Sequence, residues 1–365
     1  MRQGFWRDSS SYQRAWPFLK MKGKPVKPQD IQIKNKTILT GDRPTGPLHL
    51  GHLAGTLLAR VDLQRENDQT ILVADLQALT DNAKAPGRLA GNVLEVMLDY
   101  LAVGINPEQS NFALQSAIPE LAELSMLYMN LVSTAQLERN PTIRSEIQGR
   151  GFGASVPAGF LCYPVSQAAD ITGFGADLVP AGADQEPIVE LTNLVVDRVN
   201  RLAGQGPAPL VRATLFRSHA PRLPGVDGAG KMSKSAGNAI SLSDSADEIR
   251  AKVRAMFTDP DHLQVSDPGK VEGNVVFAML DAFDPDQAAL VDLKAQYRRG
   301  GLGDMVLKRR LEGILQELIA PISARRAELA RDPGEVLGVL DQGTRRARAR
   351  VAQTLSGVRR CFGLT

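Results

Sequence analysis

The sequence predicts an α/β fold in which a Rossmann-like domain with a parallel sheet is followed by a smaller all-helical domain. Two observations predict it. After Lys36, short apolar and β-branched runs alternate with longer amphipathic segments, the pattern of a parallel sheet covered by helices. From about Ser243 the apolar residues recur at helical spacing without further strand-like runs. We therefore expect three parts: an N-terminal extension, 1–36, a Rossmann-like domain, 37–242, and a helical domain, 243–365.

The elements of the Rossmann-like part follow one another in a regular order. Runs rich in β-branched residues predict strands, and the amphipathic stretches after them predict helices. The helix over 87–104 ends at a glycine, a common helix stop. The expected order is strand 36–41, helix 49–66, strand 70–80 running into polar residues, helix 87–104, strand 111–116, helix 120–139, and a strand, loop and long helix over 176–204.

The second part is predicted to be helical over 244–259, 275–283, 287–300 and 304–330. Between the two parts lies 221–241, which is rich in glycine and serine and is predicted to be a loop. In the last predicted helix, six apolar residues share one face at helical spacing: Leu307, Leu311, Ile314, Leu315, Leu318 and Ile319.

Bulk composition excludes several classes of protein. The 365 residues are 43% hydrophobic and 23% charged, with a mean hydropathy of −0.15, as in an ordinary globular protein. No apolar run approaches the ~20 residues that cross a bilayer, so we expect no membrane partner. Cys162 and Cys361 show no pairing pattern and predict free thiols in a reducing compartment, the cytoplasm.

Charge is distributed unevenly along the chain. Residues 298–365 hold 13 arginines and one lysine against seven acidic residues, a net charge of +7 within a whole-chain value of +3. Such a basic region suggests a polyanion, with RNA or DNA as the first candidate, although solvated helix faces explain it equally well. Residues 1–36 lack both periodicity and a secretory core, and we expect a flexible arm whose aromatic residues could dock on a protein partner.

The segment TGDRPTGPLHLGH, 40–52, carries two of the four histidines of the chain. A strand, a Pro/Gly turn and a helix beginning near Leu48 would place backbone N–H groups and a positive helix end at the edge of the sheet. His49 and His52, three residues apart, would share one side of the first helical turn, and Gly51 would leave room for a flat ligand. The arrangement suits a nucleoside triphosphate, and it is neither a Walker loop nor a GxGxxG motif. The alternative is a pair of surface histidines on an ordinary helix.

A second segment, GKMSKS, brings two lysines to a flexible loop. Lys231 and Lys234 are flanked by serines and follow a glycine-rich stretch, so that they could close on a polyphosphate. Taken alone, a solvated pair of loop lysines is the simpler interpretation. HLGH and KMSKS in this order, about 180 residues apart and on either side of a sheet domain, resemble the paired signatures of class I aminoacyl-tRNA synthetases.

Further stretches narrow the resemblance. QLERNPT, YPVSQAADITGF and VPAGADQEPIVELT are similar to segments of tryptophanyl-tRNA synthetases, as is TGDRPTGPLHLGH, and the resemblance runs from about Lys36 to the C-terminus. It implies ATP-dependent activation of L-tryptophan to tryptophanyl-adenylate and transfer to tRNA(Trp), by a homodimer whose helical domain binds the tRNA. Mg²⁺ would arrive with ATP, because no carboxylate cluster suggests a protein metal site. His49, His52, Lys231 and Lys234 would be the catalytic residues and, with Mg²⁺, would neutralise charge on the phosphates.

The resemblance also implies residue roles in the two halves of the site. Asp170 would accept the indole N–H, which distinguishes tryptophan from phenylalanine, and Tyr163 and Gln185 would hold the ammonium group. Gln77, Gln167 and Gly41 complete the predicted tryptophan site. The predicted ATP site comprises Arg43, Pro44, Thr45, Gly51, His52, Gly182, Ala183, Asp184, Leu223, Lys231, Met232, Ser233, Lys234 and Ser235.

Departures from the family pattern leave alternatives open. Gln77 stands where many bacterial members have histidine, and Gln167 where many have methionine, so the pocket is more polar and polar-substituted tryptophans are a hypothesis. A tyrosyl-tRNA synthetase shares the two signatures and the fold. A synthetase-like paralogue that binds RNA or a protein with reduced catalysis is the more distant alternative.

Overall fold

Five parallel strands form the centre of the molecule. The computed structural model describes residues 33–82, 86–152, 155–217, 223–234 and 236–364. The sheet order is β3-β2-β1-β4-β5, so the direction of winding reverses between β1 and β4. In such sheets ligands bind outside the carboxyl ends of the strands at the switch point. The predicted Rossmann-like fold is confirmed, with β1 (Thr37–Asp42), β2 (Asp68–Val73), β3 (Ser110–Leu114), β4 (Leu178–Ala181) and β5 (Thr214–Arg217).

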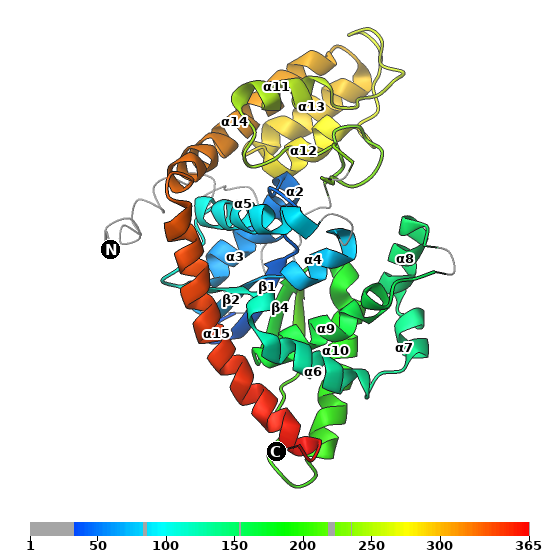
Figure 1. The fold of residues 1–365 in the computed structure, drawn as a ribbon. Helices are drawn as coiled ribbons and strands as arrows, with labels where there is room; N and C mark the ends of the chain where they lie inside the picture. The colour runs from blue at the N-terminus through cyan, green and yellow to red at the C-terminus, as the bar shows by residue number, and fades with distance from the viewer. Residues whose placement is uncertain (1–32, 83–85, 153–154, 218–222, 235, 365) are drawn as a thin grey trace.

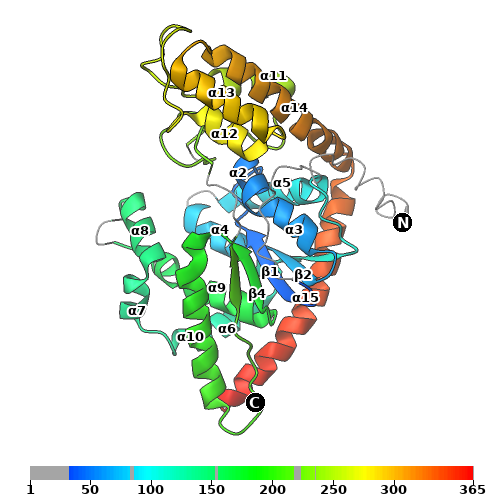
Figure 2. The same ribbon diagram turned by 180° about the vertical axis from the view of Figure 1, so that it is seen from behind.

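Helices cover both faces of the sheet and form a separate group at its carboxyl end (Figures 1 and 2). A π-helical turn, Leu53–Leu57, joins the first two of them into one rod. The helices are α2 (Leu50–His52), α3 (Leu58–Leu63), α4 (Asp75–Asn82), α5 (Leu89–Ala102), α6 (Pro119–Met129), α7 (Thr134–Arg139), α8 (Pro141–Arg150), α9 (Ala158–Gly173), α10 (Glu186–Leu202), α11 (Ala246–Arg254), α12 (Val275–Phe283), α13 (Gln287–Arg299), α14 (Asp304–Leu329) and α15 (Pro333–Cys361).

The pairing of β1 with β2 explains why the first strand ends in glycine. The two strands pair in parallel from Thr37 opposite Asp68 to Asp42 opposite Val73. A Cβ atom at Gly41 would lie 2.0 Å from the carbonyl oxygen of Leu72. Any larger residue would therefore push the strands apart just where the site begins.

Several elements differ from the sequence prediction. The predicted helix over 120–139 is two helices, because Ser133 and Gln136 form a capping box that starts α7 afresh. The polar residues after β2 form α4, which had been expected to continue the strand. Neither α9, which contains Pro164, nor the four-residue edge strand β5 had been predicted. Proline and short length hide the periodicity on which such predictions depend.

The last helix, α15, lies along the sheet rather than with the other helices of the C-terminal part (Figure 1). It approaches β3 closely, since a Cβ atom at Gly343 would lie 2.0 Å from the carbonyl oxygen of Phe112. Residues 304–329 form the single helix α14, and its predicted apolar face is buried except for the partly buried Ile314. The division at residue 243 stays a prediction.

Arginines of α15 pair with acidic residues of the sheet region. Arg348 contacts Glu120 at 2.8 Å, and Arg350 contacts Asp68 at 2.5 Å. The positive charge of 298–365 is therefore in part neutralised within the molecule. Arg299, Arg309 and Arg331 are exposed and form no ion pair within the described residues. No helix in the described part of the chain has both the length and the apolarity needed to cross a membrane.

Candidate active site

The first signature lies at the carboxyl end of β1, beside the switch point of the sheet. His49 is the N-cap of α2, and its Nδ1 accepts the backbone N–H of Gly51 at 3.1 Å. The backbone N–H of His49 donates in turn to Nδ1 of His52 at 3.3 Å. The ring centroids are 4.0 Å apart, as the three-residue spacing predicted. Because Nδ1 is the acceptor in both rings, a neutral imidazole carries its hydrogen on Nε2.

Both histidines are uncharged at neutral pH. Burial, helped by His52 and Lys234, lowers the pKa of His49 to about 3. Burial also lowers the pKa of His52 to about 4, although Asp42 opposes the change. In the structure without a nucleotide, these imidazoles are therefore neutral groups with Nε2–H donors, and the expectation that they neutralise phosphate charge stays a prediction.

A buried charged cluster supports the first signature from below. Arg60 is 1% exposed, and its Nη1 donates to Asp42 at 2.6 Å. The hydroxyl of Tyr100 donates to the same carboxylate oxygen at 2.7 Å. Burial acts to raise the pKa of Asp42, but Arg60, His52 and Tyr100 together hold it well below its usual range. A permanent negative charge thus lies beneath His52 at the end of β1.

The second signature folds back onto the first. The segment that precedes it pairs with it, because the N–H of Met232 donates to the carbonyl of Leu223 at 3.1 Å. The Nζ of Lys234 donates to the carbonyl oxygen of Gly46 at 2.6 Å and lies 3.4 Å from Oγ1 of Thr45. Burial lowers the pKa of Lys234. The two signatures, far apart in sequence, therefore meet at one place.

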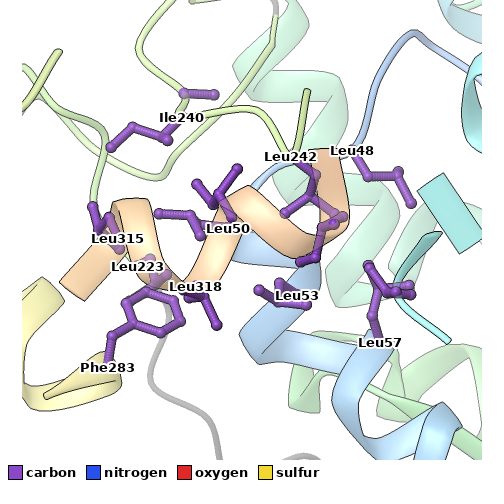
Figure 3. Packing of buried hydrophobic residues seen from close by; sticks show 14 of the residues in the cluster. Leu48, Leu50, Leu53, Leu57, Leu223, Ile240, Leu242, Phe283, Leu315 and Leu318 are labelled. Carbon is purple, nitrogen blue, oxygen red and sulfur yellow. The ribbon is translucent and has the colours of Figure 1, made fainter. Parts of the chain in front are cut away.

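Apolar packing holds the same two segments together (Figure 3). Leu50 donates its N–H to the carbonyl of Ile240 at 3.0 Å, and Leu242 donates to the carbonyl of Leu48 at 2.9 Å. The side chains of these residues lie in one buried cluster. Of the remaining second-signature residues, Lys231 is exposed, Met232 is buried and Ser233 is half-buried, while Ser235 lies outside the described residues.

Asp170 lies in a buried amide cage on α9. It is 4% exposed, and its carboxylate accepts Nε2 of Gln77 at 2.6 Å and Nε2 of Gln115 at 2.9 Å. Burial raises the pKa of Asp170 to about 8; Gln115 opposes the increase and the nearby Asp75 adds to it. The structure thus brings Gln77 to Asp170, as predicted from sequence, and adds Gln115, which no motif had indicated.

Tyr163, Gln167 and Asp170 share one face of α9, at positions i, i+4 and i+7. Burial and the hydrogen-bonded Glu146 raise the pKa of Tyr163. Oε1 of Gln167 is buried and has no hydrogen-bond partner among the described residues. A row of polar groups therefore runs along this face of α9.

Other predicted residues surround these two clusters. Arg43 reaches from the first signature to α4, where its Nη1 lies 3.4 Å from Oγ1 of Thr80, and its charge acts on Tyr163. It therefore links the histidine side of the site to the Asp170 side. Pro44 is buried. At the carboxyl end of β4, Gly182 precedes a short 3-10 turn formed by Ala183, Asp184 and Gln185.

Sequence reasoning missed several residues of this site. Gln115 immediately follows β3, so a polar residue after a strand could have indicated it. Glu146, Arg60, Tyr100 and Asp99 reach the site from helices whose faces the sequence alone does not orient. Within the described residues, no group of three or more histidine, cysteine or acidic side chains is arranged to hold a metal ion.

Known proteins with similar sequences belong to one family of tRNA synthetases. The family model for tRNA synthetases class I (W and Y) matches residues 33–320. A tryptophan–tRNA ligase of Streptococcus pyogenes is 52% identical over 338 residues, covering 90% of this chain and 98% of that protein. A tryptophan–tRNA ligase of Clostridium longisporum is 51% identical over 334 residues, covering 91% and 98%.

Solved structures agree. The tryptophanyl-tRNA synthetase from Campylobacter jejuni, complexed with ADP and tryptophan, has a TM-score of 0.76 and 27% identity, covering 90% of this chain and 99% of that one. A tyrosyl-tRNA synthetase from Archaeoglobus fulgidus, complexed with L-tyrosine, has a TM-score of 0.61 at 22% identity, covering 79% of this chain and 89% of that one, and shares the fold alone.

Proposed function

This chain belongs to the class I tRNA synthetases for tryptophan and tyrosine, and we propose that within this family it is a tryptophan–tRNA ligase whose site works as follows. It activates L-tryptophan with ATP and transfers the product to tRNA(Trp). The observation that carries the assignment of roles is the meeting of Lys234 with the turn at Gly46, which unites the two signatures. The same proposal places the enzyme in the cytoplasm, with its tRNA substrate.

In the first step, a carboxylate oxygen of tryptophan attacks the α-phosphorus of ATP. The bond from that phosphorus to the β-phosphate oxygen breaks, and pyrophosphate leaves with the electron pair. An ionised carboxylate needs no general base, so catalysis depends on positioning and on stabilising charge. In the second step, the terminal ribose hydroxyl of the tRNA attacks the activated carbonyl and AMP leaves.

The phosphate side of the site combines neutral donors with mobile charge. His49 and His52 would donate Nε2–H bonds to phosphate oxygens, and Gly51 would let the nucleotide approach the backbone. A Cβ atom at Gly51 would meet the His49 ring at 2.9 Å, so this position tolerates no side chain. Lys231 and Lys234 would supply positive charge, while Mg²⁺ would enter with the phosphates of ATP.

The remaining predicted ATP contacts come from three loops that border the sheet edge. The loop after β1 supplies Arg43, Pro44 and Thr45, and the loop after β4 supplies Gly182, Ala183 and Asp184. The third loop supplies Leu223 and, from the second signature, Met232, Ser233 and Ser235. These assignments stay proposals.

The amino acid side would be selected by the amide cage around Asp170. Its carboxylate would accept the indole N–H, and a substrate without that donor would leave a buried acceptor unpaired. Tyr163 and Gln185 would hold the ammonium group, with the carboxylate of Glu146 close to Tyr163. Gly41 would line the floor of this pocket.

The tRNA would lie across the helical part of the chain. Arg299 on α13 and Arg309 on α14 are exposed arginines without an ion pair in the described structure, and they are the proposed phosphate contacts. A homodimer is proposed through α6, where Met126 is 65% exposed and Met129 is 40% exposed. Of the suggested protein-binding arm, 1–36, residues 1–32 lie outside the described residues.

Aminoacylation of purified tRNA tests the proposal. Tryptophan should be charged, and Lys231→Ala and Asp170→Ala should each reduce charging strongly. ATP–pyrophosphate exchange with tyrosine in place of tryptophan tests the near alternative, and activity with tyrosine alone would replace the proposal. Good ATP binding with no exchange for either amino acid would instead favour a paralogue without catalysis.

A further inference from the structure

The carboxylate of Asp99, on α5, joins the first signature to the distant helix α14. Its Oδ2 accepts the backbone N–H of Leu48 at 2.6 Å, one residue before His49. Its Oδ1 accepts Nε of Arg326, near the end of α14, at 2.8 Å. Asp99 is completely buried, and both of its oxygens are occupied. One side chain therefore ties the turn that carries the histidines to a helix far along the chain.

Burial of this group has an electrostatic cost. Desolvation raises the pKa of Asp99 to about 6; the N–H of Leu48 and Arg326 oppose the rise, and Glu95 adds to it. Glu95 also pairs with Arg326, and the charge of Asp99 reaches Lys234 of the second signature. Without Arg326, the carboxylate of Asp99 would lose its ion pair with α14. The remaining charged neighbours would be Glu95, which repels it, and Lys234, which attracts it.

We infer that Asp99, held by Arg326, is a positioning residue for the ATP side of the site. This inference rests on the proposed function. By fixing the N–H of Leu48, the carboxylate sets where α2 begins, and so where His49 and His52 present their Nε2–H donors. Because a displacement of ~1 Å can cost ~10²-fold in rate, a small shift of this turn would be costly.

Helix α14 makes this position depend on the helical part of the chain. It has 26 residues and is therefore about 39 Å long. At its first turns, Lys308 donates to the carbonyls of Arg254 and Met256 at 2.8 Å each. Midway, Leu315 and Leu318 pack beside Leu50 in the same buried cluster (Figure 3). The position of Leu48 therefore depends, through α14, on the position of the helices that α14 contacts.

Asp170 has a different set of partners. It is held by Gln77 on α4 and Gln115 after β3, and no hydrogen bond joins these residues to Asp99 or Arg326 within the described part of the chain. A positioning role therefore predicts that the two substrates respond differently. Loss of the Arg326 contact should weaken the use of ATP and spare tryptophan, whereas general damage to the fold would affect both.

The test compares Arg326→Gln with Arg310→Gln. Arg310 is a matched control, because it lies on the same helix and its Nε pairs with the fully buried Asp284 at 2.5 Å, within the helical part. In ATP–pyrophosphate exchange, we expect Arg326→Gln to raise the KM for ATP or lower kcat/KM for ATP by between about tenfold and about a hundredfold, with the KM for tryptophan unchanged. Arg310→Gln should change neither.

Two further variants keep the test decisive. Asp99→Asn should reproduce the ATP defect, and the double variant with Arg326→Gln should be no worse than either single one. Arg326→Lys should recover part of the loss, and it carries the test if Asp99→Asn does not fold. Equal changes in the two KM values, or the same ATP defect in Arg310→Gln, would overturn the inference. If the wild-type protein exchanges no pyrophosphate with tryptophan, the proposed function fails, and the dissociation constant of ATP alone still tests the role of Asp99.

Discussion

The ammonium nitrogen of Lys234 donates to the carbonyl oxygen of Gly46 over 2.6 Å, although 188 residues separate them. The lysine is thus already drawn toward the phosphate side of the site, where it uses a backbone carbonyl as its acceptor. Gly46 has a φ of 122°, which favours glycine, and this turn conformation exposes the carbonyl to the lysine. An incoming phosphate would have to replace this carbonyl as the acceptor.

The first prediction concerns that lysine. Lys234→Ala should lower kcat for ATP–pyrophosphate exchange by about 10²- to 10³-fold, the usual effect of removing one charge-stabilising donor. The thermal unfolding midpoint should change little, because the side chain contacts only a turn. Lys270→Ala serves as the control, because Lys270 is an exposed lysine that pairs with the exposed Asp261. Equal activities of the two variants would contradict the role of Lys234.

The second prediction follows from the neutral state of the two histidines. Since the pKa values of His49 and His52 are lowered to about 3 and about 4, exchange should show no imidazole titration near its ordinary value of about 6.5. The lowered pKa values also make the stability of the fold depend on pH. The direction is opposite to that of a histidine whose pKa is raised by an ion pair. The unfolded chain takes up protons below about 6.5 and the folded chain does not, so stability should fall with pH from there toward about 4. Activity and urea unfolding measured over this range provide the check.

The second prediction extends to a substitution that separates the folding role of His49 from its proposed chemical role. Asparagine at position 49 can still accept the N–H of Gly51 as an N-cap, but it lacks the Nε2–H donor. His49→Asn should therefore keep the unfolding free energy and lose most exchange activity, while His49→Ala should lose both. An active His49→Asn enzyme would show that the ring serves the helix alone.

The first four strands and the meeting of the two signatures could be predicted from the sequence. β2 is predictable because it ends in the apolar run Ile71–Val73, and the two signatures because glycine, histidine and lysine occur there in an unusual order. The partners of these residues could not be predicted. Asp99, Arg60 and Gln115 depend on which helix face meets which strand end, and that is a property of tertiary packing. The number of arginines of α15 that are free to meet a polyanion could not be predicted either, because partners such as Glu120 are distant in sequence.

The third prediction uses the buried pair beneath His52. Arg60→Leu would leave the partly buried carboxylate of Asp42 without its cation, and it should reduce the free energy of unfolding by about 3 to 5 kcal/mol. The exposed pair of Arg212 with Asp197, at 2.5 Å, is the comparison. Arg212→Leu should change stability by less than about 1 kcal/mol. Chemical denaturation of both variants measures the difference, and similar losses would mean that burial does not set the strength of the pair.

The fourth prediction is a pH dependence of tryptophan binding. Because the free Asp170 has a pKa raised to about 8 and the indole N–H favours the ionised carboxylate, affinity for tryptophan should increase with pH up to about 8 and then level off. The affinity can increase by at most about tenfold per pH unit, because one proton is released. The groups facing this carboxylate are the neutral Gln77 and Gln115 and the acidic Asp75.

The same group affects stability with the opposite sign. The folded pKa of Asp170 exceeds its unfolded value, so its contribution to stability is present below about pH 4 and is lost as pH rises through about 8.

The affinity for tryptophan is measured by equilibrium binding of labelled tryptophan without ATP, between about pH 6 and about pH 9. Asp170→Asn should bind weakly and without pH dependence; a pH-dependent variant would assign the effect to another group.

The fifth prediction concerns the polar pocket. Oε1 of Gln167 is a buried acceptor that has no partner among the described residues, and an unmet acceptor costs about 1 to 3 kcal/mol. A hydroxyl group on the indole ring could donate to it, whereas tryptophan itself could not. We therefore expect the ratio of kcat/KM for a hydroxytryptophan to that for tryptophan to fall by between about fivefold and about a hundredfold in Gln167→Met. Gln77→His, which changes the amide cage on the other side of Asp170, is the control and should affect tryptophan and its analogue alike. Rejection of every ring-substituted analogue by the wild-type enzyme would contradict this role of Gln167, because a pocket that excludes all substituents has no room for a donor beside its amide.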